Sequence, residues 1–439
     1  MERRLRISLF AALSLLASPA IRAAETPEGE PPMALEQCVR TALEKHGSVL
    51  SANEDVAAAR AGLRSAGSSL WYPTVSARTG RNEGERESHP SGGLPSRISS
   101  MAGEDHRLTL GVQLYDGGQQ RQAVRRARAD ETSAEAALRR TQLALALNVT
   151  AAYVQLLKAR HTLEVADKRV ELAQAQKAMV QGRIKAGAAA DVDIYPIEVQ
   201  IASARVEQIK AANDVRVTGS ALRNAMGLDA GKTPDIVELP EDLQEPPALD
   251  ACIQEALTAR PETAQSVAGM DRSRASLALT KLRTKPLIIS SAQFDRGFGA
   301  TSIATEWLVS AALSWSLFNR GDRADVDSAT AGLRALEEDY RQLRKDIISE
   351  VEQAHLAVGS ARERVEASRA SVTAARKNLE VAEAKYKLDL GILIEIVDAQ
   401  VAYSNAELQA IQARYDYFLA RAQLDRAMGR GPLEAESRQ

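Results

Sequence analysis

The chain has 439 residues, a length typical of two or three domains, and its formal net charge of −2 at pH 7 argues against nucleic-acid binding, which needs a basic excess. Its two cysteines exclude a disulfide-stapled fold and a multi-cysteine zinc site. Apolar residues reach 45% but aromatic residues only 4%, and much of the apolar share is alanine, a composition that favours long, closely packed helices.

The first residues are predicted to be a secretory signal peptide, residues 1–24. Three arginines between positions 3 and 6 precede an apolar run, Ile7 to Ala17, that is too short to span a bilayer. Segments 18–20 and 22–24 both offer a cleavage site, so the cleavage position stays open. No later segment holds 18 consecutive apolar residues, so an exported chain without transmembrane helices is expected, either soluble or a β-barrel.

The remainder of the chain contains two similar halves. The opening ALEQCVRTAL at 34–43 matches ALDACIQEAL at 248–257, and each half ends in Ala-Met-Gly, at 225–227 and 427–429. The organisation predicted from this is repeat 1 at 25–228, a proline-rich acidic linker at 229–247, repeat 2 at 248–429 and a tail at 430–439. The first half carries extra residues between Gly80 and His106, rich in Gly, Ser and charge, which we expect to form a long exposed loop.

Each half is expected to begin with helices and then to form a strand pair, near 74–116 and near 287–318. Residues alternate there with the period of two that outer-membrane strands show. One face would carry Leu108, Leu110, Val112 and Leu114 in the first pair, and Trp307, Val309, Ala311, Leu313, Trp315 and Leu317 in the second.

A long helical hairpin follows each strand pair, at 119–227 and at 322–429. From Gln119 to Gln181 there is neither Gly nor Pro, so a helix of roughly 100 Å is predicted at about 1.5 Å per residue. Breaks at 186–188 and 390–391 separate it from returning helices that start near Asp191 and Glu395. Four strands cannot close a barrel, which takes at least about eight, so several copies must pool their strands.

These pieces together resemble the TolC-type outer membrane factors, over nearly the whole length from Ala34 to Gly429. The most specific segments are ALEQCVRTAL, LYDGG, RIKAGAAADVD and VDAQVAYSNAELQAIQARYDY. The resemblance implies a mainly α fold with a small β part, in which a homotrimer forms an outer-membrane β-barrel and an α-helical periplasmic tunnel.

The function implied by the resemblance is passive conduction, as the outer-membrane channel of a tripartite efflux pump or type I secretion system. It places the chain in the outer membrane of a Gram-negative cell, with most of its mass in the periplasm. Its partners would be a periplasmic adaptor, an inner-membrane transporter of RND, ABC or MFS type, and outer-membrane lipid, but not nucleic acid. No catalytic residue, cofactor or metal site is predicted. The alternative is a periplasmic adaptor or coiled-coil scaffold without a pore, but an adaptor would have one hairpin, whereas this chain has two.

The resemblance also places a periplasmic gate at the hairpin tips, with Asp193, Tyr386, Glu395 and Asp398 as its residues. Three-fold symmetry would turn Glu395 and Asp398 into carboxylate rings that attract cations. Two positions depart from the family pattern, since Asp389 stands where a glycine is usual and Gly391 where some members carry arginine. A hydrogen bond between Tyr386 and Asp193 stays a hypothesis.

The tip residues Arg183, Gly187 and Gly391 are expected to contact the adaptor. Simpler interpretations stay open beside these: the three acids cap helix N-termini, the two glycines only make turns, Arg183 lies on a solvated face, and Tyr386 is a packing aromatic. Cys38 and Cys252 occupy equivalent positions of the two repeats, and small buried hydrophobic residues are a better interpretation than a disulfide.

Overall fold

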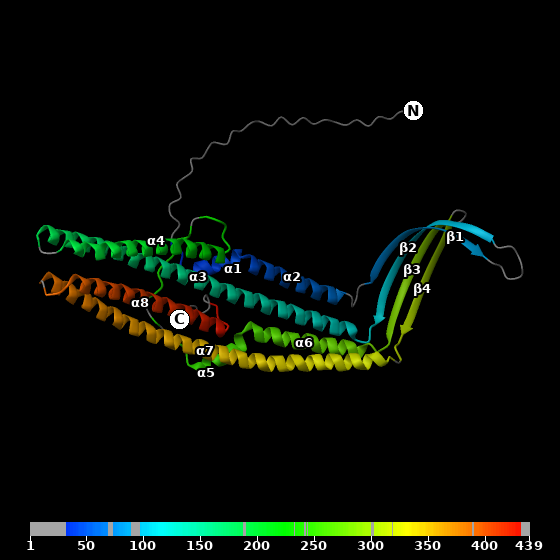
Figure 1. Cartoon of the computed structure of the whole chain (residues 1–439). Helices are drawn as coiled ribbons and strands as arrows, with labels where there is room; N and C mark the ends of the chain where they lie inside the picture. The colour runs from blue at the N-terminus through cyan, green and yellow to red at the C-terminus, as the bar shows by residue number, and fades with distance from the viewer. Residues whose placement is uncertain are drawn as a thin grey trace, which may run out of the picture.

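The protein is elongated, with long helices at one end and a curved sheet at the other (Figure 1). The computed structural model describes residues 32–68, 73–88, 97–187, 190–231, 233–240, 243, 245–299, 303–317, 319–388 and 390–431. The predicted signal peptide and most of the predicted tail lie outside the described residues.

The order of elements is the same in both halves, and corresponding elements have similar lengths. The helices α3 and α7 have 67 and 68 residues, which makes each about 100 Å long. The first half contains α1 (Leu35–Lys45), α2 (Gly47–Ser68), β1 (Thr74–Ser88), β2 (Arg97–Tyr115), α3 (Gln119–Lys185), a short 3-10 helix (Asp191–Asp193) and α4 (Ile194–Ala225). The second contains α5 (Leu249–Ala259), α6 (Pro261–Leu282), β3 (Leu287–Gly299), β4 (Ile303–Ser314), α7 (Arg320–Lys387) and α8 (Leu393–Ala427).

The long helices lie side by side and form a wall. In the half that ends in the hairpin tips, α3 packs between α4 and α8, and α7 packs on the other side of α8 (Figure 1). In the half next to the sheet, α3 packs between α2 and α6, and α7 packs on α6. The wall therefore has two lateral borders, one formed by α4 and α2 and the other by α7.

The two main cores lie midway along the wall, where α1 and α5 pack on it. One surrounds Tyr153 and Leu156 of α3, and the other surrounds Val351 and Val358 of α7. Cys38 and Cys252 are fully buried in these two cores with free thiols, which confirms their prediction as small buried hydrophobic residues. Within the described residues, no helix has an apolar stretch long and hydrophobic enough to cross a bilayer.

The sheet is antiparallel, in the order β1-β2-β3-β4. The prediction of a long loop between Gly80 and His106 is wrong for most of that segment, because β1 continues to Ser88 and β2 begins at Arg97. Gly, Ser and charged residues are typical of loops, but an exposed hairpin needs no apolar core, and opposite charges such as Arg81 and Glu104 face each other across the strands.

An irregularity in β2 corrects the predicted face of Leu114. The register shifts between Gln113 and Tyr115, so that Tyr115 becomes the partner of Ile288. Since cross-strand partners share a face and Ile288 pairs with Leu313, Tyr115 takes the place on the apolar face that simple alternation gives to Leu114.

Candidate functional site

The sheet has one apolar face that no other described part of the chain covers. Its rows include Leu108 with Phe294 and Trp307, and Leu110 with Ala292 and Val309. Trp307 is 77% exposed and Leu313 is 67% exposed. Aromatic residues stand at both limits of this face, Trp307 and Phe294 at one and Tyr115 at the other, a distribution found where a protein surface passes through a lipid bilayer.

The opposite face of the sheet is polar. Arg107 Nε lies 2.7 Å from Asp295 Oδ1, and the hydroxyl groups of Ser291 and Ser310 lie 2.9 Å apart. The sheet is therefore amphipathic, and its polar face suits contact with water while its apolar face suits contact with hydrocarbon.

Both borders of the molecule carry unused interaction surface. Among the described strands, β1 and β4 each pair on one side only. The border helix α4 exposes a helical stripe of apolar residues, and α7 exposes apolar residues on its own outer side. The stripe on α4 consists of Tyr195, Val199, Val206, Ile209 and Val217 and is preceded by Val192 of the 3-10 helix, and the residues on α7 include Leu356 and Val381, with Leu388 directly after the helix. Such borders need a partner of complementary shape.

At the hairpin tips, Arg183 of α3 reaches across to Tyr386 of α7. The guanidinium carbon lies 4.7 Å from the centroid of the Tyr386 ring, and Nη1 donates to the Tyr386 carbonyl oxygen at 3.4 Å. Tyr386 is buried and packs with Leu379 and Ile396. Arg183 is half-buried and its guanidinium stacks on the Tyr386 ring, so its interpretation as part of a solvated face is wrong.

Asp193 takes the capping position at the start of the returning helix. Its Oδ2 accepts a hydrogen bond from the backbone N–H of Ala190 at 3.2 Å, and its own N–H donates to the Ala190 carbonyl oxygen at 3.0 Å. In the described structure no hydrogen bond joins it to Tyr386, so the hypothesis of that bond is wrong for this conformation. Asp193 is the last residue of the short 3-10 helix that precedes α4, and this extra turn explains why α4 starts later than predicted.

The second tip exposes both remaining acids. Glu395 lies in the first turn of α8, and Asp398 lies one turn further along on the exposed side.

The two tip glycines are required for different reasons. Gly187 has a φ of +72° and ends α3, whereas a Cβ at Gly391 would stand 3.1 Å from Cβ of Lys385 and 3.2 Å from Oε2 of Glu395.

A buried polar seam separates the two hairpins just above the tips. Gln176 of α3 is only 5% exposed, and neither its amide nitrogen nor its amide oxygen has a hydrogen-bond partner. It borders a cavity of about 200 Å³ whose wall also includes Glu383 and Gln400. Gln400 accepts a hydrogen bond from Gln200 at 3.2 Å. An unsatisfied buried amide weakens packing, so the hairpins adhere less firmly here than in the cores.

The linker between the repeats forms a strap across the wall that the sequence did not reveal. Glu238 accepts hydrogen bonds from Tyr415 Oη at 2.6 Å and from His161 at 2.9 Å, and Arg414 lies 3.4 Å away. Burial raises the pKa of Glu238, but the hydrogen bonds from Tyr415 and His161 outweigh burial and hold its pKa below the usual value. The strap thus ties α3 to α8 through one carboxylate.

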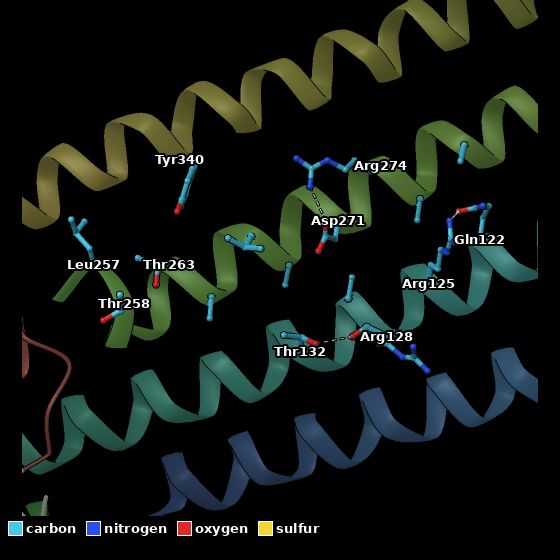
Figure 2. Close-up of a pocket in the computed structure, with 16 residues that line it drawn as sticks. Gln122, Arg125, Arg128, Thr132, Leu257, Thr258, Thr263, Asp271, Arg274 and Tyr340 are labelled. Carbon is cyan, nitrogen blue, oxygen red and sulfur yellow. Dashed lines mark hydrogen bonds and ion pairs between the residues drawn. The ribbon is translucent and has the colours of Figure 1, made fainter. Parts of the chain in front are cut away.

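Another hollow lies nearer the sheet, between α3, α6 and α7, and has a volume of about 780 Å³ (Figure 2). Figure 2 shows Arg125 and Arg128 on α3, Asp271 and Arg274 on α6, and Tyr340 on α7. Arg274 Nη1 bonds Asp271 at 2.8 Å. The wall brings together no nucleophile with a base, and nowhere among the described residues do three or more His, Cys, Asp or Glu form a group suited to a metal ion.

Comparisons with known proteins agree on one group. The family model described as outer membrane efflux protein matches residues 38–228 and 252–430. The probable efflux pump outer membrane protein TtgC of Pseudomonas putida is 24% identical over 415 residues, which covers 91% of this chain and 84% of that protein. The outer membrane protein TolC of Vibrio cholerae is 22% identical over 303 residues, 66% of this chain and 68% of that protein. The crystal structure of the Campylobacter jejuni CmeC outer membrane channel covers 90% of this chain and 85% of its own, with a TM-score of 0.77 and 16% identity.

Proposed function

This chain belongs to the outer membrane efflux protein family, and from that premise we propose that three copies form a passive export duct through the outer membrane and the periplasm. The observation that carries the proposal is the amphipathic sheet, exposed on its apolar face and open at both edges, at the end of a wall of helices about 100 Å long.

A closed ring satisfies both borders of the molecule at once. If β1 of one copy pairs with β4 of the next, three copies of four strands give twelve, which exceeds the roughly eight that closure requires. The same rotation brings the apolar stripe of α4 against the outer side of α7 in the neighbouring copy. The trimer thereby removes open strand edges from lipid, where unsatisfied backbone groups are costly.

The oligomeric state is tested by light scattering on the mature protein purified in detergent. A mass of three chains is expected after correction for bound detergent. A monodisperse single chain that stays soluble without detergent would contradict both the trimer and the membrane placement, and would favour the pore-free scaffold.

The narrow end of the duct lies at the hairpin tips. Here Arg183, stacked on Tyr386, ties the first hairpin to the second, while Glu395 and Asp398 supply negative charge at the mouth. Three-fold repetition of these acids would concentrate cations and repel anions. Because the seam at Gln176 is poorly satisfied, separation of the hairpins is expected to begin there once the tip contact breaks.

Single-channel recording in a planar bilayer tests this gate. Arg183→Ala is expected to raise the conductance, because the contact between the hairpins is lost. Glu395→Ala and Asp398→Ala are expected to reduce cation selectivity. The matched control is Asp339→Ala, an exposed acid of α7 far from the tips. Unchanged selectivity in both tip variants would remove the carboxylate ring from the proposal.

The partners follow from the passive character of the duct. An inner-membrane transporter of RND, ABC or MFS type would supply energy, and a periplasmic adaptor would meet the turns that contain Gly187 and Gly391. Cysteines placed at Ala186 and at Leu390 should cross-link to an adaptor co-expressed from a neighbouring gene. Both positions are exposed, so if neither cysteine cross-links to any adaptor encoded beside this chain, the tip contact is refuted.

A further inference from the structure

A third cavity lies at the junction of the sheet and the helices, with a volume of about 600 Å³. It opens between the end of α6, the chain that follows β4, and the first turns of α7. Three exposed cations stand in its wall, Lys281, Arg320 and Arg323. None of the three makes an ion pair with any other described residue.

The carboxylates of the same cavity do not balance these cations. Asp322 and Asp327 are the two acids of the wall, and Asp322 already accepts a hydrogen bond from the Asn319 side chain at 2.9 Å. The neighbouring Arg283 and Asp325 neutralise each other at 2.9 Å. Across the junction segments 116–128, 280–286 and 319–327 the sequence has nine basic and four acidic residues, a net charge of +5 in a chain whose total is −2.

The cavity also continues the apolar face of the sheet. Leu317 lines it and is 77% exposed, and alternation beyond β4 places Leu317 and Trp315 on the same side as Leu313. The indole of Trp315 donates to the carbonyl oxygen of Thr284 at 3.0 Å, so its ring is fixed beside the end of α6. An apolar surface thus meets a cationic hollow, with a tryptophan where they join, as at the boundary between acyl chains and headgroups.

We propose that this junction cavity binds the phosphate headgroup of an anionic phospholipid from the periplasmic leaflet of the outer membrane, with the start of its acyl chains against Leu317 and Trp315. The inference rests on the proposed placement of the sheet in the membrane. Lys281 and Arg323 supply the positive charge that binds the phosphate. The net positive charge of the junction segments favours an anionic lipid over a zwitterionic one.

Native mass spectrometry of the purified full-length protein in detergent tests the site. Phosphatidylglycerol and phosphatidylcholine are titrated separately onto the wild type, onto the double variant Lys281→Gln/Arg323→Gln, and onto the control Arg334→Gln/Arg369→Gln. The control removes two exposed cations of α7 away from the junction. The wild type and the control should prefer phosphatidylglycerol, and the junction variant should lose about tenfold in its affinity for that lipid.

Equal binding of both lipids by the wild type, or an unchanged preference in the junction variant, would overturn the site. Inorganic phosphate that displaces phosphatidylglycerol at equal concentration would also overturn it, because the ligand would then be a free anion. Conductance of the junction variant in a phosphatidylcholine bilayer is measured in parallel. It should match the wild type, so loss of lipid preference is distinguishable from failure of the channel itself.

Discussion

Gly227, which ends the first hairpin, allows a sharp test of how the helices are packed. Its φ is +69°, and its missing side chain faces backbone: a Cβ there would lie 2.8 Å from Cα of His46 and 3.2 Å from the carbonyl carbon of Lys45. Gly187 at the tip has a nearly identical φ of +72°, but nothing lies within 4 Å of its Cβ position. The two glycines share the same backbone requirement and differ in packing.

The two substitutions to alanine therefore separate the two costs. Gly187→Ala should cost only the left-handed conformation, about 1–2 kcal/mol. Gly227→Ala adds displacement of the junction between α1 and α2, and overpacking of that kind costs about 1–3 kcal/mol more. Gly227→Ala should therefore destabilise the core that surrounds Met226 and Cys38 by a total of about 2–5 kcal/mol.

The assay is thermal unfolding followed by circular dichroism in detergent, at one fixed heating rate because the apparent Tm of an irreversible transition depends on that rate. Gly227→Ala should lower the apparent Tm clearly more than Gly187→Ala does. Gly429→Ala should resemble Gly227→Ala, since a Cβ at Gly429 would stand 2.9 Å from the carbonyl carbon of Ala259. An equal fall in Tm for Gly187→Ala and Gly227→Ala would refute the packing argument.

Three further predictions concern the sheet, the strap and the seam. Val309→Lys on the apolar face should reduce folded protein in outer-membrane fractions, at about 2–4 kcal/mol for a cation at the bilayer midplane, whereas Ser310→Lys on the polar face should insert normally; equal insertion would reverse the assignment of the faces. Because the pKa of Glu238 is lower in the folded state, its contribution to stability is present above its unfolded pKa and lost as pH falls through the folded value. In the Glu238→Gln variant, Tm should thus fall less steeply below about pH 4.5 than in the wild type. If Tm fell equally steeply in both proteins, the Glu238 carboxylate would not stabilise the fold in this way. Gln176→Leu removes an unsatisfied buried amide whose burial costs about 1–3 kcal/mol, so the hairpins should separate less readily. The open probability in bilayer recordings should therefore fall, and a higher open probability would contradict the weak packing proposed at the seam.

Features with a local cause were predictable from residue order alone. The run without Gly or Pro from Gln119 to Gln181 predicted α3, and the same plan in the second repeat predicted α7, because a helix depends on hydrogen bonds four residues apart. Alternation predicted the apolar face around Leu108 and Trp307, because strand side chains point to opposite sides in turn. Family membership followed from the doubled motifs, and the comparisons confirmed it.

Features that depend on distant parts of the chain were decided only by the tertiary structure. Arg183 and Tyr386 are 203 residues apart in sequence, and Tyr415 and Glu238 are 177 apart, so no local period relates them. The irregularity at Tyr115 likewise depends on the register against β3, which lies in the other repeat. Local periodicity sets which side of an element is apolar, but the choice of partner for each polar or aromatic side chain is made by packing, after the two repeats have come together.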